Sequence, residues 1–201
     1  MSTLSRILVC LVAVFSFNLI ASADLVNLVV NPGFETGNFA GWTQSGNTDF
    51  TGVAGSAALP PSSFGAFFGP QGSLGFLSQN LVTDPGASYD LTFWLLNQGG
   101  TPNQFQASWN GSVITGSLMN NAAAFDYTQF TFQGLLATGS STVLEFGFRQ
   151  DPSFWFLDDV SVTRASVPEP LSSLWLGLTL AGMLGAKRLQ KHRLDRKSLD
   201  Q

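Results

Sequence analysis

The side chains best suited to chemistry are polar and aromatic residues at outward positions of the strands that the sequence predicts. They combine flat rings with amides, a carboxylate and a guanidinium: Trp94, Gln106, Ser108, Tyr127, Gln129, Glu145, Arg149 and, as a further candidate, Trp155. Flat rings stack on the C–H face of a pyranose, and amides and charged groups hydrogen-bond its hydroxyls. The set therefore predicts a carbohydrate-binding face. The alternative is that Trp94 and Trp155 pack under loops of an aromatic-rich sandwich.

Four carboxylates offer, in principle, an acid–base pair for glycoside hydrolysis: Glu35, Glu145, Asp151 and Asp159. That chemistry needs two carboxyl groups that face each other across a cleft. Nothing in the spacing of the four distinguishes them from ordinary turn or loop carboxylates. We therefore expect no catalytic residues and a protein that is not an enzyme.

Cysteine and histidine chemistry is excluded from the central part of the chain. The only cysteine, Cys10, and the only histidine, His192, lie near the two ends. A Ser–His–Asp triad, a disulfide and a zinc site with histidine or thiolate ligands are therefore excluded there. Residues 24–166 also carry ten acidic side chains against two basic ones. An acidic body repels phosphate backbones, so nucleic acid is not an expected partner.

The elements that must position these side chains are short strands separated by turn residues. Apolar or alternating runs predict strands at residues 25–30, 89–96, 105–109, 128–132, 144–148 and 156–163. Gly, Pro, Asn and Asp cluster between most of them, which is typical of tight turns. No helix longer than two turns is indicated. Residues 24–164 are thus expected to form one all-β domain, an antiparallel β-sandwich.

The N-terminal segment has the three parts of a secretory signal peptide. Arg6 precedes an apolar run at residues 7–20, and Ala-Ser-Ala at 21–23 forms a small-x-small cleavage site. We expect signal peptidase to remove residues 1–23. A retained anchor is the alternative, but the apolar run is shorter than the roughly 20 residues that a membrane span needs.

The C-terminal segment reads as a linker, a membrane helix and a basic tail. A linker at 165–170 contains the Pro168-Glu169-Pro170 motif, residues 171–186 are apolar, and residues 187–201 begin with a basic cluster. A helix of this length is a minimal transmembrane span, and basic residues favour a cytoplasmic location for its C-terminal end. The domain would then lie outside the inner membrane and the tail inside.

This order of motif, short apolar helix and basic cluster, over residues 167–197, resembles the PEP-CTERM sorting signal, also catalogued as an ice-binding protein C-terminal domain. The resemblance implies that an integral-membrane exosortase recognises Pro168-Glu169-Pro170 and removes the tail. It also implies a link to exopolysaccharide at the cell surface or in the extracellular matrix. The chain departs from the pattern by continuing to Gln201, and a plain single-pass anchor remains the alternative.

A second resemblance covers residues 27–163. Asn-Pro-Gly-Phe-Glu at 31–35 with Gly-Trp at 41–42, Leu-Ser-Gln-Asn at 77–80, and Phe-Leu-Asp-Asp-Val-Ser-Val at 156–162 occur in sequence order. They are similar to galactose-binding-like jelly-roll domains, which include carbohydrate-binding modules. The resemblance implies a jelly-roll β-sandwich.

In that family the first and last strands lie side by side and often share a structural Ca²⁺, and Glu35 and Asp158 occupy the matching positions. By period 2, Asp158 shares the face of Val160 and Val162, so we expect its carboxylate to point inward. Oxygen ligands suit Ca²⁺. The alternative is that both carboxylates accept hydrogen bonds from loop N–H groups without a metal.

Together these patterns predict an exported surface or matrix protein that binds carbohydrate, exopolysaccharide in particular, without catalysis. A structural matrix or adhesion protein with no specific ligand is the first alternative. A glycoside hydrolase is the second.

Overall fold

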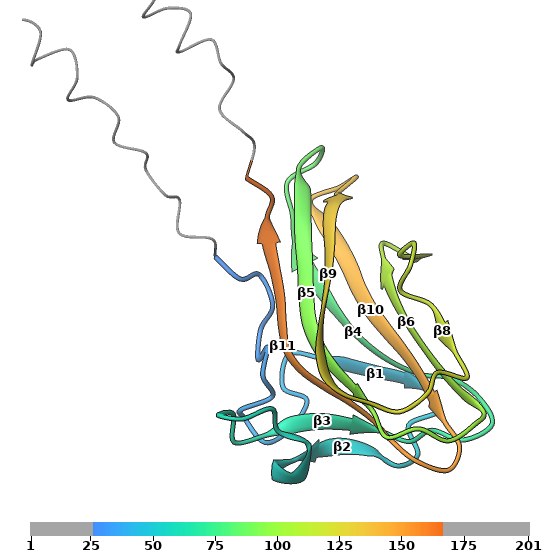
Figure 1. Ribbon diagram of the computed structural model, residues 1–201. Coiled ribbons are helices and arrows are strands. Elements are labelled where there is room, and N and C mark those ends of the chain that lie inside the picture. Colours follow the sequence, from blue (N-terminus) through green and yellow to red (C-terminus); the bar gives the residue numbers. More distant parts are fainter. Residues whose placement is uncertain (1–25, 167–201) are drawn as a thin grey trace, which may run out of the picture. The chain divides into compact units, whose positions relative to one another are not determined.

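The computed structural model describes residues 26–166, which form an antiparallel β-sandwich (Figure 1). The all-β sandwich predicted from the sequence is therefore confirmed. Within this described range, no helix is long and apolar enough to span a bilayer. The predicted signal peptide at 1–23, the Pro-Glu-Pro motif at 168–170, the helix at 171–186 and the tail at 187–201 lie outside the described residues.

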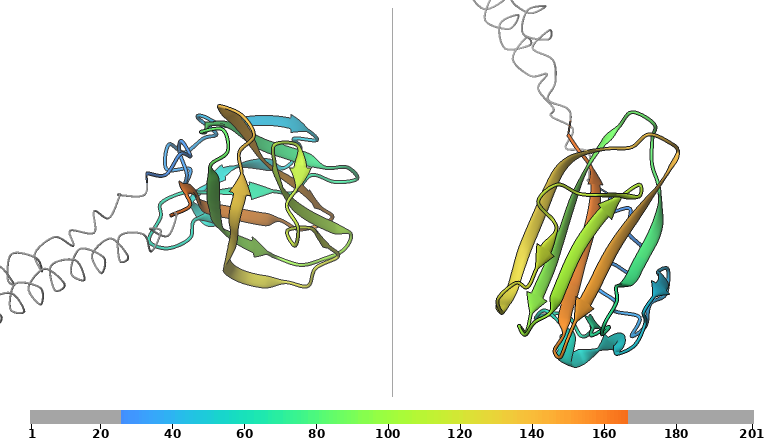
Figure 2. Two further views of the ribbon diagram at one scale, coloured as in Figure 1. Left: turned by 90° about the horizontal axis from the view of Figure 1, so that it is seen from above. Right: turned by 90° about the vertical axis from the view of Figure 1, so that its right-hand side faces the viewer.

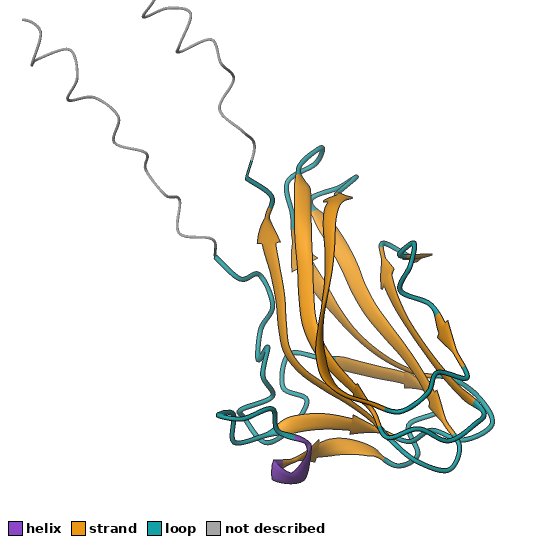
Figure 3. Ribbon diagram, viewed as in Figure 1, coloured by secondary structure: helices purple, strands orange, loops and turns teal. Residues whose placement is uncertain are grey.

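Almost every regular element of the described range is a strand, and the exception is a single short 3-10 helix (Figure 3). In chain order the elements are β1 (Thr43–Gly46), β2 (Thr51–Ala54), η1 (Gly55–Ala57), β3 (Gly65–Phe68), β4 (Gly75–Val82), β5 (Ser88–Asn97), β6 (Asn103–Trp109), β7 (Ser112–Val113), β8 (Met119–Asn120), β9 (Phe125–Leu136), β10 (Ser141–Gln150) and β11 (Trp155–Arg164).

The strands form two antiparallel sheets that pack face to face (Figure 2). Sheet A has the order β1-β4-β10-β6-β7, and β8 also pairs with β6. Sheet B has the order β2-β3-β11-β5-β9. Strands that are distant in sequence therefore lie side by side, and the outward face of each sheet brings together residues from several segments of the chain.

The layer between the sheets is mostly aromatic. Phe68 of sheet B stacks on Phe148 of sheet A, with ring centroids 3.8 Å apart and planes 4° apart. Phe93 of sheet B meets Phe146 of sheet A edge to face, with centroids 5.2 Å apart. Offset and edge-to-face ring pairs add to the free energy gained from burying apolar area. These contacts require the face of each strand that carries the rings to point into the core.

The predicted alternation along the strands is confirmed. In β5 the inward side chains are all buried, and they are Tyr89, Leu91, Phe93 and Leu95. In β6 the buried side chains include Phe105, Ala107 and Trp109, and in β10 they include Phe146 and Phe148, as expected. Because successive side chains point to opposite faces, the residues between these positions face outward.

One predicted strand is absent. Residues 26–30, the described part of the expected strand at 25–30, contain no regular strand. The side chain of Asn27 replaces the backbone ladder, since its Oδ1 accepts from Val162 N at 2.9 Å and its Nδ2 donates to Val160 O at 3.1 Å. The segment still lies beside β11, because Leu28 N donates to Val162 O at 2.9 Å. An amide that competes with backbone pairing explains the difference.

Candidate functional site

The first candidate site is an acidic cluster formed by Glu35, Asp158 and Asp159. Glu35 lies on an irregular turn in which Asn31 and Phe34 have positive φ angles of 53° and 57°. The turn is anchored because Phe34 is buried and packs on Trp42, with ring centroids 5.8 Å apart. Glu35 Oε1 accepts hydrogen bonds from Ser63 N at 3.0 Å and Phe64 N at 3.1 Å. The carboxylate therefore ties this turn to the segment that leads into β3.

Asp158 joins the cluster from β11. The register of β11 with β5 shifts between Asp158 and Ser161, and Asp159 has a φ of 48°. Because of this bulge, Leu157 before it and Val160 after it both lie in the core. The prediction that Asp158 shares the inward face of Val160 is therefore wrong. Asp158 is nevertheless 0% exposed, and its Oδ2 accepts from Leu59 N at 2.8 Å.

The side chains of the cluster meet around Gly33, where a larger residue would not fit easily. A Cβ at this position would lie 3.1 Å from Asp159 Oδ1, 3.4 Å from Asp158 Oδ1 and 3.8 Å from Glu35 Cγ. Ion pairs among residues 26–166 link Arg149 to Asp151 and Arg164 to Asp84, and neither involves this cluster. Its negative charge is therefore not balanced by a described basic side chain.

The fit of this cluster to a metal ion is mixed. Its donors are oxygen atoms only, which suits a hard cation such as Ca²⁺. Several of these oxygens already accept hydrogen bonds from backbone N–H groups, which is the arrangement expected if the carboxylates serve without a metal. No set of three or more His, Cys, Asp and Glu side chains within residues 26–166 has the geometry of a metal site. Any cation would therefore need backbone carbonyls or water to complete its coordination.

Burial and mutual repulsion change the acidity of this cluster. Burial raises the pKa of Asp158 to about 6, and the charges of Asp159 and Glu35 add to the effect. Backbone hydrogen bonds to Asp158 lower its pKa but do not offset the rise. Burial, followed by the charge of Glu35, also raises the pKa of Asp159. The cluster thus favours binding of a proton or another cation.

The second candidate site is the outward face of sheet A, which we call the polar face. It consists of residues from β4, β6 and β10: Phe76, Ser78, Gln104, Gln106, Glu145, Gly147 and Arg149. The predicted ligand-binding residues Gln106, Glu145 and Arg149 are therefore brought together here. The sequence prediction did not include Phe76, Ser78, Gln104 or Gly147.

Gly147 lies in the middle of the polar face and is buried there. Gly147 lies opposite Phe76 in β4 and opposite Gln106 in β6. A Cβ at Gly147 would lie 3.0 Å from Phe76 Cε1 and 3.0 Å from Gln106 Cγ, so both side chains lean over it. Gln104 Nε2 donates to Gln106 Oε1 at 3.2 Å, which orients the amide. The ring and the oriented amide thus cover the backbone at Gly147.

The two charged groups of the polar face have different surroundings. Arg149 Nε and Nη2 both donate to Asp151 Oδ2, at 3.0 and 2.8 Å. Glu145 lies between Ser78 and Ser108 in the cross-strand row, and Ser108 is only 4% exposed. Among the described residues, the Glu145 carboxylate has no hydrogen-bond or ion-pair partner. It is therefore available to accept hydrogen bonds from a ligand.

The remaining predicted ligand-binding residues lie elsewhere. Trp94 and Gln129 are a cross-strand pair on sheet B, on the opposite side of the sandwich from the polar face. Tyr127 is also on sheet B. Its hydroxyl donates a hydrogen bond to Ala57 O, so the side chain is held against η1 rather than left open to solvent. Trp155 is 0% exposed, so the prediction that it joins an outward face is wrong. Its ring packs against Phe105 in the core, with centroids 5.7 Å apart.

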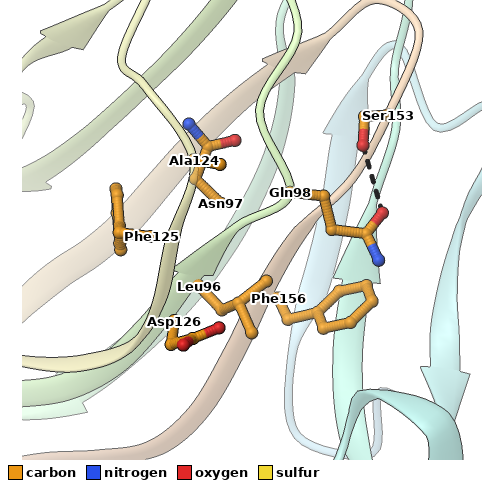
Figure 4. Close-up of a pocket in the computed structure, with 8 residues that line it drawn as sticks. All are labelled: Leu96, Asn97, Gln98, Ala124, Phe125, Asp126, Ser153 and Phe156. Carbon is orange, nitrogen blue, oxygen red and sulfur yellow. Dashed lines mark hydrogen bonds between the residues drawn. The ribbon is translucent and has the colours of Figure 1, made fainter.

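A third feature is a hollow of about 680 Å³ on sheet B, where β5 ends and β9 and β11 begin (Figure 4). Its lining includes Leu96, Gln98, Phe125, Asp126, Ser153 and Phe156. Sequence reasoning missed this hollow. The available signal was an apolar residue at an outward position in each of two strands, namely Leu96 in β5 and Phe156 in β11.

Comparisons with known proteins inform the fold. No protein-family model and no curated protein matches the sequence. Among solved structures, TmCBM61 in complex with β-1,4-galactotriose is 21% identical, with a TM-score of 0.56, and the match covers 70% of this chain and 99% of that chain. The enzymatically active domain of tailspike protein 4 of bacteriophage CBA120 is 16% identical, with a TM-score of 0.54 and coverage of 70% and 22%.

A third match is the N-terminal endo-1,4-β-D-xylanase of Clostridium thermocellum, whose CBM22-1 and GH10 modules were crystallised with xylohexaose. It is 19% identical, with a TM-score of 0.51 and coverage of 72% of this chain and 30% of that chain. This chain thus spans less than a third of two of the three matched chains. The structural neighbours include carbohydrate-binding modules, and at these identities the likeness establishes a shared jelly-roll β-sandwich fold.

The raised pKa of Asp158 predicts how stability depends on pH without metal. The folded-state pKa of about 6 exceeds the ordinary value of 3.8, so protonation favours folding, by about 3 kcal/mol at most. This stabilisation is complete below the ordinary value and is lost as the pH rises through about 6. In chelator, Asp158→Asn should have the same melting temperature as the wild type near pH 3.8. Above pH 6 the variant should have the higher melting temperature. Parallel melting curves across this range would contradict the assignment.

Proposed function

We propose that this protein is exported and binds the glycan chains of an extracellular matrix on its polar face, without catalysis. The observation that carries the proposal is the unpaired Glu145 carboxylate, on the same face as the ring of Phe76 and the oriented amide of Gln106, which lie opposite Gly147 two residues further along β10. A pyranose could place its C–H face against the ring and its hydroxyls against the carboxylate and amide. Because Gly147 has no side chain, the Phe76 ring and the Gln106 side chain can lie over the backbone there and form the surface that a sugar would meet.

The fold likeness supports this class of ligand. One structural neighbour was solved with β-1,4-galactotriose and another with xylohexaose. Both ligands are neutral oligosaccharides, which the protein's net charge of −4 would not repel as it would an acidic polysaccharide. We therefore expect an uncharged polysaccharide segment to bind along the polar face.

The polar face supports binding better than hydrolysis. Hydrolysis would require a second carboxyl group opposite Glu145. Asp151, which follows the end of β10, is paired with Arg149 and also accepts from Gly72 N at 3.1 Å. Glu35 and Asp159 belong to the acidic cluster around Gly33. A structural matrix or adhesion protein without a specific ligand is the remaining alternative, and the binding experiment below distinguishes it.

We further propose that Glu35 and Asp158, with Asp159 beside them, hold a structural Ca²⁺. Carboxylate oxygens of Asp158 and Asp159 and the side chain of Glu35 lie around Gly33, and no described basic side chain balances their charge, which supports this role. A bound cation would join the turn at Glu35 to the bulge of β11 and stabilise both. It would have no part in sugar chemistry.

For cellular location we propose export through the signal peptide at 1–23, anchoring in the inner membrane through the helix at 171–186, and exosortase processing at Pro168-Glu169-Pro170. The mature protein would then be at the cell surface or in the matrix. The sequence order of motif, apolar run and basic cluster supports this proposal.

Substitution on the polar face should weaken glycan binding. After a glycan array identifies a bound oligosaccharide, Glu145→Gln should raise its Kd by about 10- to 100-fold, because a hydrogen bond to a charged acceptor contributes roughly 1.5–3 kcal/mol. Phe76→Ala should also weaken binding, through loss of stacking. Gln133→Ala, an exposed change on β9, is the matched control. A blank array, or equal affinities for Glu145→Gln and the control, would favour the structural alternative.

Calcium should stabilise the folded protein at neutral pH. Free Ca²⁺ at about 100 times its Kd adds about 2.7 kcal/mol to the free energy of unfolding. Differential scanning fluorimetry should therefore show a higher melting temperature in Ca²⁺ than in chelator. The increase should vanish in Asp158→Asn and persist in Asp49→Asn, an exposed carboxylate outside the cluster. Identical melting curves for the wild type in Ca²⁺ and chelator would remove the metal site.

Processing at the sorting motif predicts a shorter mature chain. Intact-mass measurement should show that protein from native cells lacks both residues 1–23 and the segment that contains Trp175. Replacing Pro168-Glu169-Pro170 with alanines should leave the tail attached. Mature wild-type protein that retains Trp175 would instead indicate a plain membrane anchor.

A further inference from the structure

The hollow on sheet B has an apolar floor at a position where an antiparallel sheet would ordinarily face water. Leu96 of β5 and Phe156 of β11 lie directly opposite each other and form this floor. Both alternate with core residues, so neither is needed to fill the space between the sheets. The hollow measures about 680 Å³ and is open to solvent, so it would cover one side of a ligand rather than enclose it.

Polar groups stand on two sides of this floor (Figure 4). Ser153 Oγ donates to Gln98 Oε1 at 3.1 Å, and the amide nitrogen of Gln98 is turned away from Ser153, on the side of Phe156. Asp126 lies next to Leu96 (Figure 4). Among the described residues, the Asp126 carboxylate accepts no hydrogen bond. The hollow therefore presents a donor on one side, an acceptor on the other, and an apolar surface between them.

Buried amides hold the walls of the hollow in place. Asn97, which is 1% exposed, donates to Ala122 O at 3.0 Å and Ala123 O at 3.2 Å. Asn97 Oδ1 accepts from Gly99 N and from Gln150 Nε2, both at 2.9 Å. These bonds tie the end of β5 to the segment that leads into β9. Buried and mutually satisfied polar groups rigidify the backbone, so the chain that carries Gln98 is held in place before a ligand arrives.

The charge of the hollow restricts the ligand. Its lining contains one carboxylate, Asp126, and no lysine or arginine. A uronate or a sulfated sugar would be repelled, whereas a neutral sugar would donate a hydroxyl to the carboxylate and accept from the amide. Its C–H face would rest on Leu96 and Phe156.

We propose that this hollow is a second sugar-binding site, which takes one neutral pyranose, and that it is separate from the polar face. It lies on the opposite sheet and shares no residue with the polar face, so either site can exist without the other. A protein with both sites would hold two glycan segments at once.

The test is an NMR titration of the full-length protein with three neutral pyranosides, namely the methyl β-glycosides of galactose, glucose and xylose. The probe signal is the side-chain amide of Gln98, assigned by its loss in Gln98→Ala. At least one neutral sugar should shift this signal in a saturable way with a Kd of about 1–10 mM, typical of a single weakly held ring. Methyl β-glucuronide should cause a much smaller shift.

Variants localise the effect. Asp126→Ala should weaken binding at the Gln98 signal at least tenfold, and Asp126→Asn, which keeps the shape, should weaken it less. Gln133→Ala, on the same strand but outside the hollow, should bind as the wild type does. Glu145→Gln should leave the Gln98 shifts unchanged, which separates this site from the polar face. Absence of a saturable shift with all three neutral sugars, an unchanged Kd in Asp126→Ala, or preference for the glucuronide would overturn the proposal.

Discussion

Aromatic packing between the sheets determines which side chains reach the surface. Phe68 on Phe148, and Phe93 against Phe146, hold sheets A and B in one relative position. Because a shift of one residue in a strand would exchange its two faces, burial of these rings also specifies the strand register. Glu145 faces outward because Phe146 must face inward. The polar face therefore depends on the core, and a loosened core would disperse it before any of its own residues changed.

Alternation predicted most of this architecture from the sequence. Strands such as β5 and β10 carry rings at every second position, and their faces follow directly from period 2. The prediction failed where local chemistry interrupts the period. The bulge after Asp158 places Leu157 and Val160 on the same side, and the Asn27 side chain replaces a strand's backbone bonds. Neither event leaves a pattern in a single sequence, because each depends on which strand lies alongside.

The candidate sites were predictable only in part, for a related reason. Gln106, Glu145 and Arg149 could be chosen by type, but Gly147 and Phe76 matter through cross-strand registers that link β4, β10 and β6. Trp155 was misplaced because a Trp at the start of a strand can lie on either face, and here it packs on Phe105. The hollow on sheet B depends on a pairing between Leu96 and Phe156, about 60 positions apart in the chain.

β11 also has a mechanical consequence. The strand starts at the hollow, next to Phe156, and ends at Arg164, about 26 Å away at roughly 3.3 Å per residue. The segment around Leu28 lies beside the same far end, since it bonds to Val162. If the chain were fixed beyond Arg164 while a polymer pulled at the hollow, the load would run along β11. The hydrogen bonds between β11 and β5 would then share the force as a shear rather than break one after another.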